Sequence, residues 1–311
     1  MDDARTPETT PEREDAWFDS HGDRCAAWVY RPAPDTGPAP VIVMAHGFGS
    51  VRDLRLPAYA ERFRDAGFAV VVFDYRHFGA SDGQPRQLLD IGRQLEDWRA
   101  ALAFARTLDG IDPDRVIAWG TSFAGGHVIT LAGTGERLLG IVAQVPHVSG
   151  PAALRATGLA ACLRLTPAIV TDLWRAARGR EPRYVASVGR PGAVAAMTSP
   201  DADPAVARLV WASGFRRGEV DETVAARVLL RLGAYTPGRR AARVACPALV
   251  QIATRDAITP AATARRVADR MPRGRYLEYD CTHFDPYVDP WFDRVVGDQI
   301  AFCRQVEDGA V

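Results

Sequence analysis

The segment RVIAWGTSFAGGHVITLAG, residues 115–133, places a serine among small residues where a strand is expected to become a helix. The apolar run RVIAW favours a buried strand, and HVITLA favours a helix. Between them, Gly120, Ser122 and Ala124 match the G-x-S-x-G pattern, with alanine in place of the last glycine. The serine is therefore either a nucleophile on a tight strand-to-helix turn or part of a close-packed turn with no chemical role.

The sequence around this junction alternates between strand-like and helix-like segments. Short apolar runs predict strands, and longer amphipathic runs predict helices. Because the two alternate from about residue 40 to 146 and again after residue 243, we expect right-handed crossovers and a largely parallel sheet. The predicted strands are 16–20, 25–32, 40–47, 68–76, 115–120, 138–146, 247–254 and 275–280, and the predicted core helices are 56–67, 93–108, 123–133, 259–272 and 291–306.

Residues 148–243 interrupt this alternation. They are rich in alanine and arginine, contain helical patterns and show no strong buried strand. We therefore expect one α/β core, residues 16–147 and 244–311, with a helical lid inserted at residues 148–243. The acidic, Pro/Thr-rich residues 1–15 do not resemble a signal peptide and are predicted to form a disordered lead.

Composition excludes several classes of function. The 311 residues carry 38 basic and 38 acidic side chains, so no charged field favours binding to nucleic acid or to an anionic membrane. Every basic residue is arginine, which excludes a catalytic lysine or a P-loop. The five scattered cysteines lack metal-ligand or disulfide spacing. We expect a cytoplasmic protein with no cofactor, no metal, no nucleic-acid partner and no membrane span; its oligomeric state stays open, with a dimer as one alternative.

Two further residues complete a predicted catalytic triad with Ser122. A serine hydroxyl needs a base, and that base needs an orienting carboxylate. Asp256 follows the predicted strand 247–254, and His283 follows the strand 275–280. Because the carboxyl ends of parallel strands meet at one edge of a sheet, we expect all three side chains there. The backbone N–H groups of Phe48 and Phe123 are the predicted oxyanion hole.

With these parts assembled, the chain resembles an α/β-hydrolase-fold serine hydrolase. More narrowly, it resembles the bacterial enzymes grouped with dienelactone hydrolases, serine aminopeptidases and X-Pro dipeptidyl-peptidase-type esterases. The resemblance covers residues 16–147 and 244–305, departs from the common pattern at Ala124 and His77, and is carried by HGFGSVRD (46–53), VVVFDYRHFGASDG (70–83), RVIAWGTSFAGGH (115–127), ATRDAIT (253–259) and THFDPY (282–287).

Other polar residues have both a structural and a functional interpretation. The candidate pocket residues are His46, Gly47, His77 and His147. His46 is expected mainly to bond its own loop, and bordering the pocket is one alternative for His147. Three aspartates compete with Asp256 for the role of the acid, namely Asp74, Asp280 and Asp285.

The predicted function is cleavage of a small-molecule ester or thioester through an acyl-serine, without a cofactor. Since this fold also hosts other reactions, an acyl transferase, cyclase or lyase of secondary metabolism stays open as the alternative. A binding protein that keeps the fold would have lost a member of the triad, and this sequence keeps all three.

Overall fold

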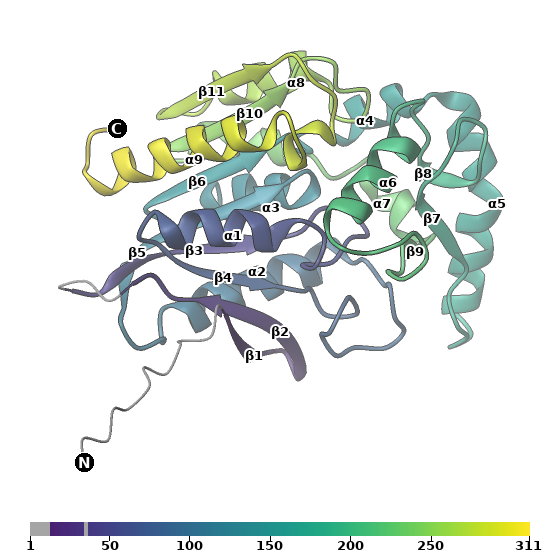
Figure 1. Cartoon of the computed structure of the whole chain (residues 1–311). Helices are drawn as coiled ribbons and strands as arrows, with labels where there is room; N and C mark the ends of the chain where they lie inside the picture. Colours follow the sequence, from purple (N-terminus) through teal and green to yellow (C-terminus); the bar gives the residue numbers. More distant parts are fainter. Residues whose placement is uncertain (1–12, 34–36) are drawn as a thin grey trace.

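The central sheet is the framework of the molecule, which the computed structural model describes over residues 13–33 and 37–311 (Figure 1). Its strand order is β1-β2-β4-β3-β5-β6-β10-β11. β1 and β2 pair in antiparallel fashion, β2 is antiparallel to β4, and the remaining neighbours are parallel. This topology confirms the predicted fold, with strands β1 Glu14–Ser20, β2 Asp23–Tyr30, β3 Ala39–Ala45, β4 Ala69–Phe73, β5 Ile111–Thr121, β6 Gly140–Gln144, β10 Ala248–Ala253 and β11 Gly274–Tyr279.

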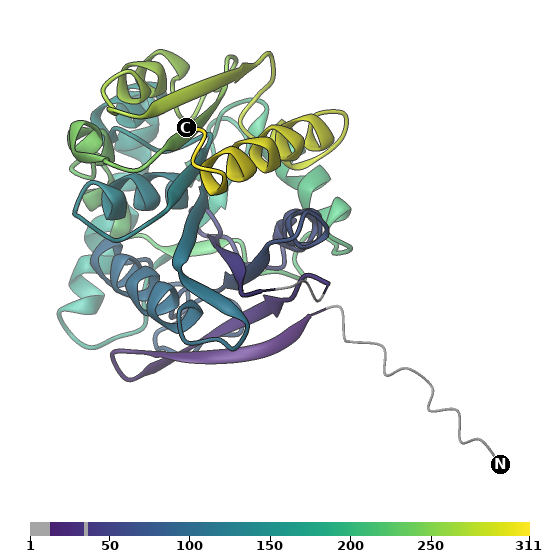
Figure 2. The same ribbon diagram turned by 90° about the vertical axis from the view of Figure 1, so that its left-hand side faces the viewer.

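Helices cover both faces of this sheet (Figure 2). On β3, Val41 and Val43 belong to the core beneath one set of helices, whereas Ile42 and Met44 belong to the core beneath the other. This alternation follows from the two-residue period of a strand, and it explains why strands buried on both faces read as continuous apolar runs. The first set comprises α2 Ile91–Ala105, α3 Phe123–Ala132 and α8 Ala261–Ala268; the second comprises α1 Leu56–Asp65 and α9 Phe292–Glu307.

The lid lies between β6 and β10 and covers one end of the sheet, at the right of Figure 1. The prediction of a purely helical lid is wrong in one respect, because β8, β7 and β9 form a small sheet. Two of its strands have only 3 residues each, too few to show a strand pattern in the sequence. The lid elements are α4 Gly150–Thr157, α5 Leu159–Ala176, β7 Tyr184–Val188, β8 Ala195–Met197, α6 Ala202–Ala212, β9 Thr223–Ala225, α7 Val228–Leu232 and the 3₁₀ helix η1 Pro237–Arg243.

The lid is tied together internally by a buried aspartate. Asp172 of α5 accepts hydrogen bonds from the backbone N–H groups of Arg183 and Arg227, and it forms an ion pair of 2.8 Å with the Arg227 side chain. Burial alone would raise the pKa of Asp172, but the hydrogen bonds from Arg227 and Arg183 outweigh burial and lower it. This carboxylate therefore fixes α5 against the chain on either side of the lid sheet.

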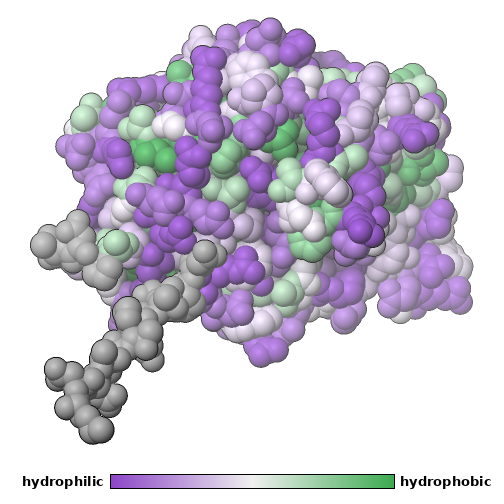
Figure 3. Space-filling model, viewed as in Figure 1, coloured by the Kyte–Doolittle hydropathy of each residue, from purple (hydrophilic) through white to green (hydrophobic). Residues whose placement is uncertain are grey.

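Helices α4 and α5 meet at Gly158, whose φ of 82° lies in the left-handed region, and they are bent by 104°. Within residues 13–33 and 37–311, no single helix is long and apolar enough to cross a bilayer; α4 and α5 meet that test only when they are taken together. Leu159, Leu163 and Val170 of α5 are exposed, and Figure 3 shows hydrophobic residues at the edge of the molecule where the lid lies.

The N-terminal boundary differs from the prediction. Residues 1–12 of the expected lead lie outside the described residues. Glu14 and Asp15, which were expected in the lead, instead belong to β1, where Glu14 pairs with Val29. Side chains along β1 alternate between more exposed and more buried positions, so the strand extends two residues further than its apolar part indicates.

Candidate active site

Ser122 lies on a strained turn between the end of β5 and the start of α3. Its φ of 55° and ψ of −111° are rarely adopted by a residue with a side chain. The turn is tight enough that a Cβ atom at Gly120 would collide with the Ala124 carbonyl. Alanine at 124 is itself fully buried and fits, so the departure from the glycine pattern leaves this geometry intact.

The structure brings the three predicted triad residues together. The Nε2 atom of His283 lies 2.9 Å from the Ser122 hydroxyl, and Nδ1 lies 2.6 Å from the Asp256 carboxylate. The His283 and Asp256 side chains are each only 1% exposed. Since a carboxylate can only accept, Nδ1 carries the proton and Nε2 is left to accept from Ser122. The arrangement can remove a proton from the serine hydroxyl.

Asp256 is held by donors that the sequence analysis did not identify. The backbone N–H groups of Ile258 and Thr259 donate to its Oδ1 at 2.7 Å, and the Thr259 hydroxyl donates to its Oδ2 at 2.7 Å. The signal in the sequence is a threonine three residues after the aspartate, a spacing at which a side chain closes a turn. These bonds fix which oxygen faces His283.

The competing aspartates have other partners. Asp280 pairs with Arg255 at 3.0 Å, and Asp285 accepts from the Thr282 backbone N–H at 2.7 Å. Asp74 is fully buried and accepts from the backbone N–H groups of Arg52 and Ala80. None of the three has a hydrogen bond to His283 within the described residues.

The loop after β3 lies beside Ser122, where an oxyanion hole is expected. A Cβ atom on Gly47 would lie 3.1 Å from Ser122 Cβ, and the rings of Phe48 and Phe123 meet edge to face at 5.8 Å. Among hydrogen bonds between described residues, neither the Phe48 nor the Phe123 backbone N–H is a donor. The oxyanion hole formed by these two amides stays a prediction.

The candidate pocket histidines differ in position. His46 Nδ1 lies 3.0 Å from the Gly47 carbonyl, and burial lowers the pKa of His46 to about 4. His147 borders a cavity beside Ser122, and burial lowers its pKa to about 4. Burial therefore favours the neutral form of both rings, and the His46 ring bonds its own loop.

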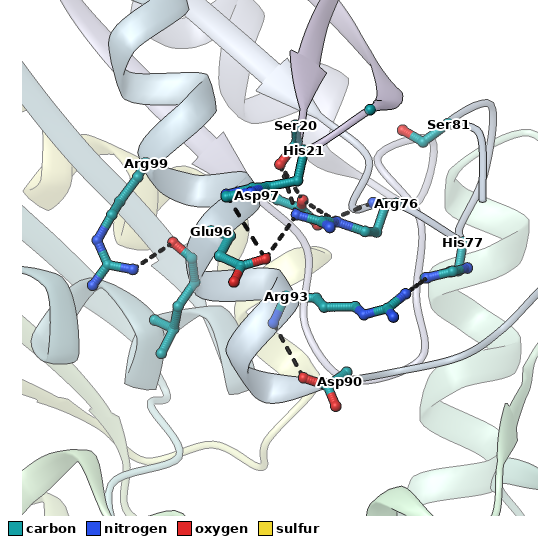
Figure 4. Close-up of polar contacts among 12 residues, drawn as sticks. Ser20, His21, Arg76, His77, Ser81, Asp90, Arg93, Glu96, Asp97 and Arg99 are labelled. Carbon is teal, nitrogen blue, oxygen red and sulfur yellow. Dashed lines mark hydrogen bonds and ion pairs between the residues drawn. The ribbon is translucent and has the colours of Figure 1, made fainter. Parts of the chain in front are cut away.

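The structure places His77 apart from the other candidate pocket residues. Its ring contacts Arg93 at 3.0 Å, in a loop beside the Arg76–Asp97 ion pair (Figure 4). It is absent from the lining of both cavities that adjoin Ser122 in the described structure. The physical reason is a left-handed turn: with φ of 73°, His77 directs its side chain toward α2.

Two cavities of the described structure adjoin Ser122, and both also border Phe48 and Met197. The first has about 670 Å³ of empty space, part of which is open to solvent, and is lined by His283 and by lid residues that include Ser187 and Glu222. The second has about 480 Å³ of empty space, also partly open to solvent, and borders Phe123, His147 and Thr259 together with α4. A substrate bound at Ser122 therefore has space on two sides.

A family model described as X-Pro dipeptidyl-peptidase (S15 family) matches residues 21–271. The chain belongs to this family. Among curated relatives of this S15-family chain, the quorum-quenching protein AidA of Acinetobacter baumannii is 42% identical over 292 residues, which cover 94% of each protein. Membership agrees with the predicted resemblance and supports a hydrolase-type enzyme.

Other comparisons find relatives that match only part of the S15-family chain, and solved structures that share its fold. A thiohydrolase, aneE of Aspergillus aculeatus, is 39% identical over 109 residues, covering 35% of this chain and 34% of that protein. A polyketide transferase, af380 of Aspergillus fumigatus, is 33% identical over 135 residues, covering 43% and 45%. The solved α/β hydrolase GrgF from Penicillium has the same fold, with a TM-score of 0.76 at 19% identity over 94% of this chain and 98% of that one.

In this S15-family chain, His127 on α3, the helix that follows Ser122, joins the core to the lid. His127 Nε2 lies 3.0 Å from the Gln94 side-chain oxygen, and Nδ1 lies 2.6 Å from the Tyr235 hydroxyl. Because the Gln94 side-chain oxygen can only accept a hydrogen bond, His127 Nε2 donates to it. Nδ1 then accepts from the Tyr235 hydroxyl. Burial, with a smaller effect from His147, lowers the pKa of His127 to about 3. The bond to Tyr235 therefore needs a neutral ring.

This arrangement predicts that acid destabilises the fold. The pKa of His127 is lower in the folded chain than in the unfolded chain, so its contribution to stability is complete above about pH 6.5 and is lost as the pH falls. Between pH 6.5 and 4.5 we expect a loss of about 2–3 kcal/mol from this residue. Urea unfolding at several pH values measures it, and His127→Gln should weaken the pH dependence. If the free energy of unfolding depended equally on pH in His127→Gln and in the unmodified protein, this role of His127 would be wrong.

Proposed function

We propose that the chain is a cofactor-independent serine hydrolase that cleaves a small-molecule ester or thioester through an acyl-serine intermediate. The observation that carries the proposal is the continuous pair of hydrogen bonds from Asp256 through His283 to Ser122. Membership of the family supports a hydrolase-type enzyme, and the geometry supports serine as its nucleophile.

In this mechanism, Ser122 Oγ attacks the carbonyl carbon while His283 Nε2 takes the hydroxyl proton. Asp256 holds the ring in the required tautomer and stabilises the imidazolium ion. The carbonyl oxygen becomes an oxyanion, which the Phe48 and Phe123 N–H groups bind; each such donor is worth about 3 kcal/mol in the transition state. His283 then gives its proton to the leaving oxygen or sulfur, and the C–O or C–S bond breaks.

The second half of the reaction uses the same groups. A water molecule loses a proton to His283 Nε2 and attacks the acyl-serine carbon. The tetrahedral intermediate collapses, Ser122 recovers its proton and the acid leaves. Esters and thioesters are favoured over amides as substrates. Their oxygen or sulfur leaves more readily without full protonation than an amide nitrogen does.

The relatives support a small-molecule substrate and a second candidate reaction. One relative is named a thiohydrolase and another a polyketide transferase. Both names fit an acyl-enzyme, which passes its acyl group to water in one case and to another nucleophile in the other. Transfer is the second candidate, because a second acyl acceptor bound in a cavity beside Ser122 would compete with water for the acyl group.

The experiment combines labelling with product analysis. A fluorophosphonate should label Ser122, and butanoyl esters and thioesters should be hydrolysed while the matching amide is not. Repeating the assay with an added alcohol or thiol distinguishes the two reactions, because a transferase forms a new ester or thioester. No labelling and no turnover of any acyl substrate would overturn the proposal.

A further inference from the structure

We propose that the small sheet of the lid positions the loop after β3, so that the Phe48 N–H can bind the oxyanion. Val224 of β9 and Ser187 of β7 are then positioning residues that act through Gly49. The inference rests on the proposed function, because acyl-serine chemistry is what supplies an oxyanion for the Phe48 N–H. It gives the lid a part in the rate of the reaction, in addition to covering the site.

The peptide unit that joins Gly47 to Phe48 is held by the core on one side. His46 Nδ1 lies 3.0 Å from the Gly47 carbonyl oxygen, and because a carbonyl can only accept, the His46 ring donates this bond. The peptide bond is trans, so the Phe48 N–H points away from the Gly47 carbonyl oxygen. The bond from His46 therefore restricts the direction in which the Phe48 N–H can point.

Gly49, the residue after Phe48, is held by the lid. Its φ of 58° lies in the left-handed region, and a Cβ atom there would lie 2.2 Å from Ser187 Oγ and 2.7 Å from Val224 Cγ1. The Ser187 hydroxyl also donates to the Gly49 carbonyl at 3.4 Å. The backbone of the loop therefore packs directly against the lid sheet, and a side chain at this position would collide with it.

The sheet that makes this contact is itself bound to the core. The Ala225 backbone N–H donates to the Gln87 carbonyl at 2.9 Å, and the Gln87 side-chain amide donates to the Asp221 carbonyl at 2.9 Å. These bonds lie on either side of Val224 in the sequence, and Val224 is fully buried. Because the sheet is fixed before a substrate arrives, it can hold Gly49 in one position.

Val224 is the residue to test, because it does not border the site. Ser187 lines one of the cavities that adjoin Ser122 in the described structure, whereas Val224 lines neither. A smaller residue at 224 therefore affects the reaction through the loop. Since the carbonyl oxygen becomes an oxyanion only during the reaction, a misplaced Phe48 N–H weakens binding of the transition state and leaves substrate binding unchanged.

The test compares two buried valines of the lid. Val224→Ala should lower kcat for a butanoyl ester by about tenfold to 100-fold and change KM less than about threefold. Affinity for a trifluoromethyl ketone, which forms an oxyanion with Ser122, should fall by a similar factor, whereas affinity for the matching methyl ketone should not. Val210→Ala is the control, because Val210 of α6 is equally buried and lines neither cavity, and it should keep kcat within about threefold.

A second variant tests the same contact by adding an atom. Gly49→Ala places a methyl group against Ser187 Oγ and Val224 Cγ1, and it should lower kcat by more than about 100-fold. Adding Ser187→Ala and Val224→Ala removes both colliding atoms and should restore at least about tenfold of this loss. The restoration should be partial, because alanine stays strained at a left-handed φ.

Hydrogen exchange separates this inference from the proposed function. Amide exchange in residues 46–53 should be faster in Val224→Ala than in the unmodified protein, and urea unfolding checks that each variant is folded. Full kcat in Val224→Ala, a change confined to KM, an equal loss in Val210→Ala, unchanged exchange, or no restoration in the triple variant would overturn the inference. An unmodified protein that hydrolyses no ester and is not labelled at Ser122 would instead overturn the proposed function.

Discussion

Replacing Ser122 with alanine is expected to lower kcat for ester hydrolysis by about 10⁵-fold to 10⁶-fold, the loss seen when a triad nucleophile is removed. The substitution removes the Oγ atom that lies 2.9 Å from His283, and with it the covalent intermediate. The residual rate should come from the oxyanion hole and substrate binding alone. Steady-state turnover of an ester measures the loss, and labelling by a fluorophosphonate should disappear.

The matched control is Ser213→Ala. Ser213 lies at the end of α6, where its hydroxyl donates to the Leu209 carbonyl, so turnover and labelling should remain close to those of the unmodified protein. If Ser122→Ala kept activity within tenfold, or if the label appeared on another residue, the acyl-serine mechanism would be wrong.

Asp256→Asn is expected to lower kcat by about 10⁴-fold, and the structure gives the reason. The Ile258 and Thr259 backbone N–H groups need an acceptor at the Oδ1 position. An asparagine would keep its oxygen there and place its NH₂ group at the Oδ2 position, facing His283 Nδ1. That NH₂ group donates, so it would hold the proton on Nε2 and prevent this atom from accepting the proton of Ser122.

Two neighbouring aspartates provide controls for this variant. Asp280 and Asp285 flank His283 in the sequence, but their side chains bind Arg255 and Thr282. The control variants are therefore Asp280→Asn and Asp285→Asn. We expect each to change kcat less than about threefold. A large loss in Asp280→Asn together with normal activity in Asp256→Asn would reassign the acid of the triad.

The sequence was sufficient to predict the core because its strands are buried on both faces. Val41, Ile42, Val43 and Met44 leave few alternatives to a central strand, and side chains that follow such strands meet at one edge. For that reason the structure brings together Ser122, Asp256 and His283 where they were expected. Their catalytic roles stay predictions until the variants are measured.

The features that the sequence could not predict arise from short strands and from the packing of the lid on the core. The strand Ala195–Met197 is too short to show alternation, so the lid sheet was missed. Glu222 reaches the cavity only because the lid folds over the core, and no spacing in the chain encodes that contact. His77 was placed in the pocket by its neighbours in sequence, but a left-handed backbone conformation directs it to Arg93.

The entry and exit of the lid have a consequence for how this family can diversify. The lid leaves the core after β6, and its two ends meet: the Gly150 N–H donates to the Tyr235 carbonyl at 2.9 Å, and the Gly238 N–H donates to the Val148 carbonyl at 2.9 Å. An inserted segment with such neighbouring ends can be exchanged as a module without breaking the pairing of any core strand. Grafting the lid of one family member onto the core of another should therefore transfer substrate selectivity while the catalytic groups stay where they are.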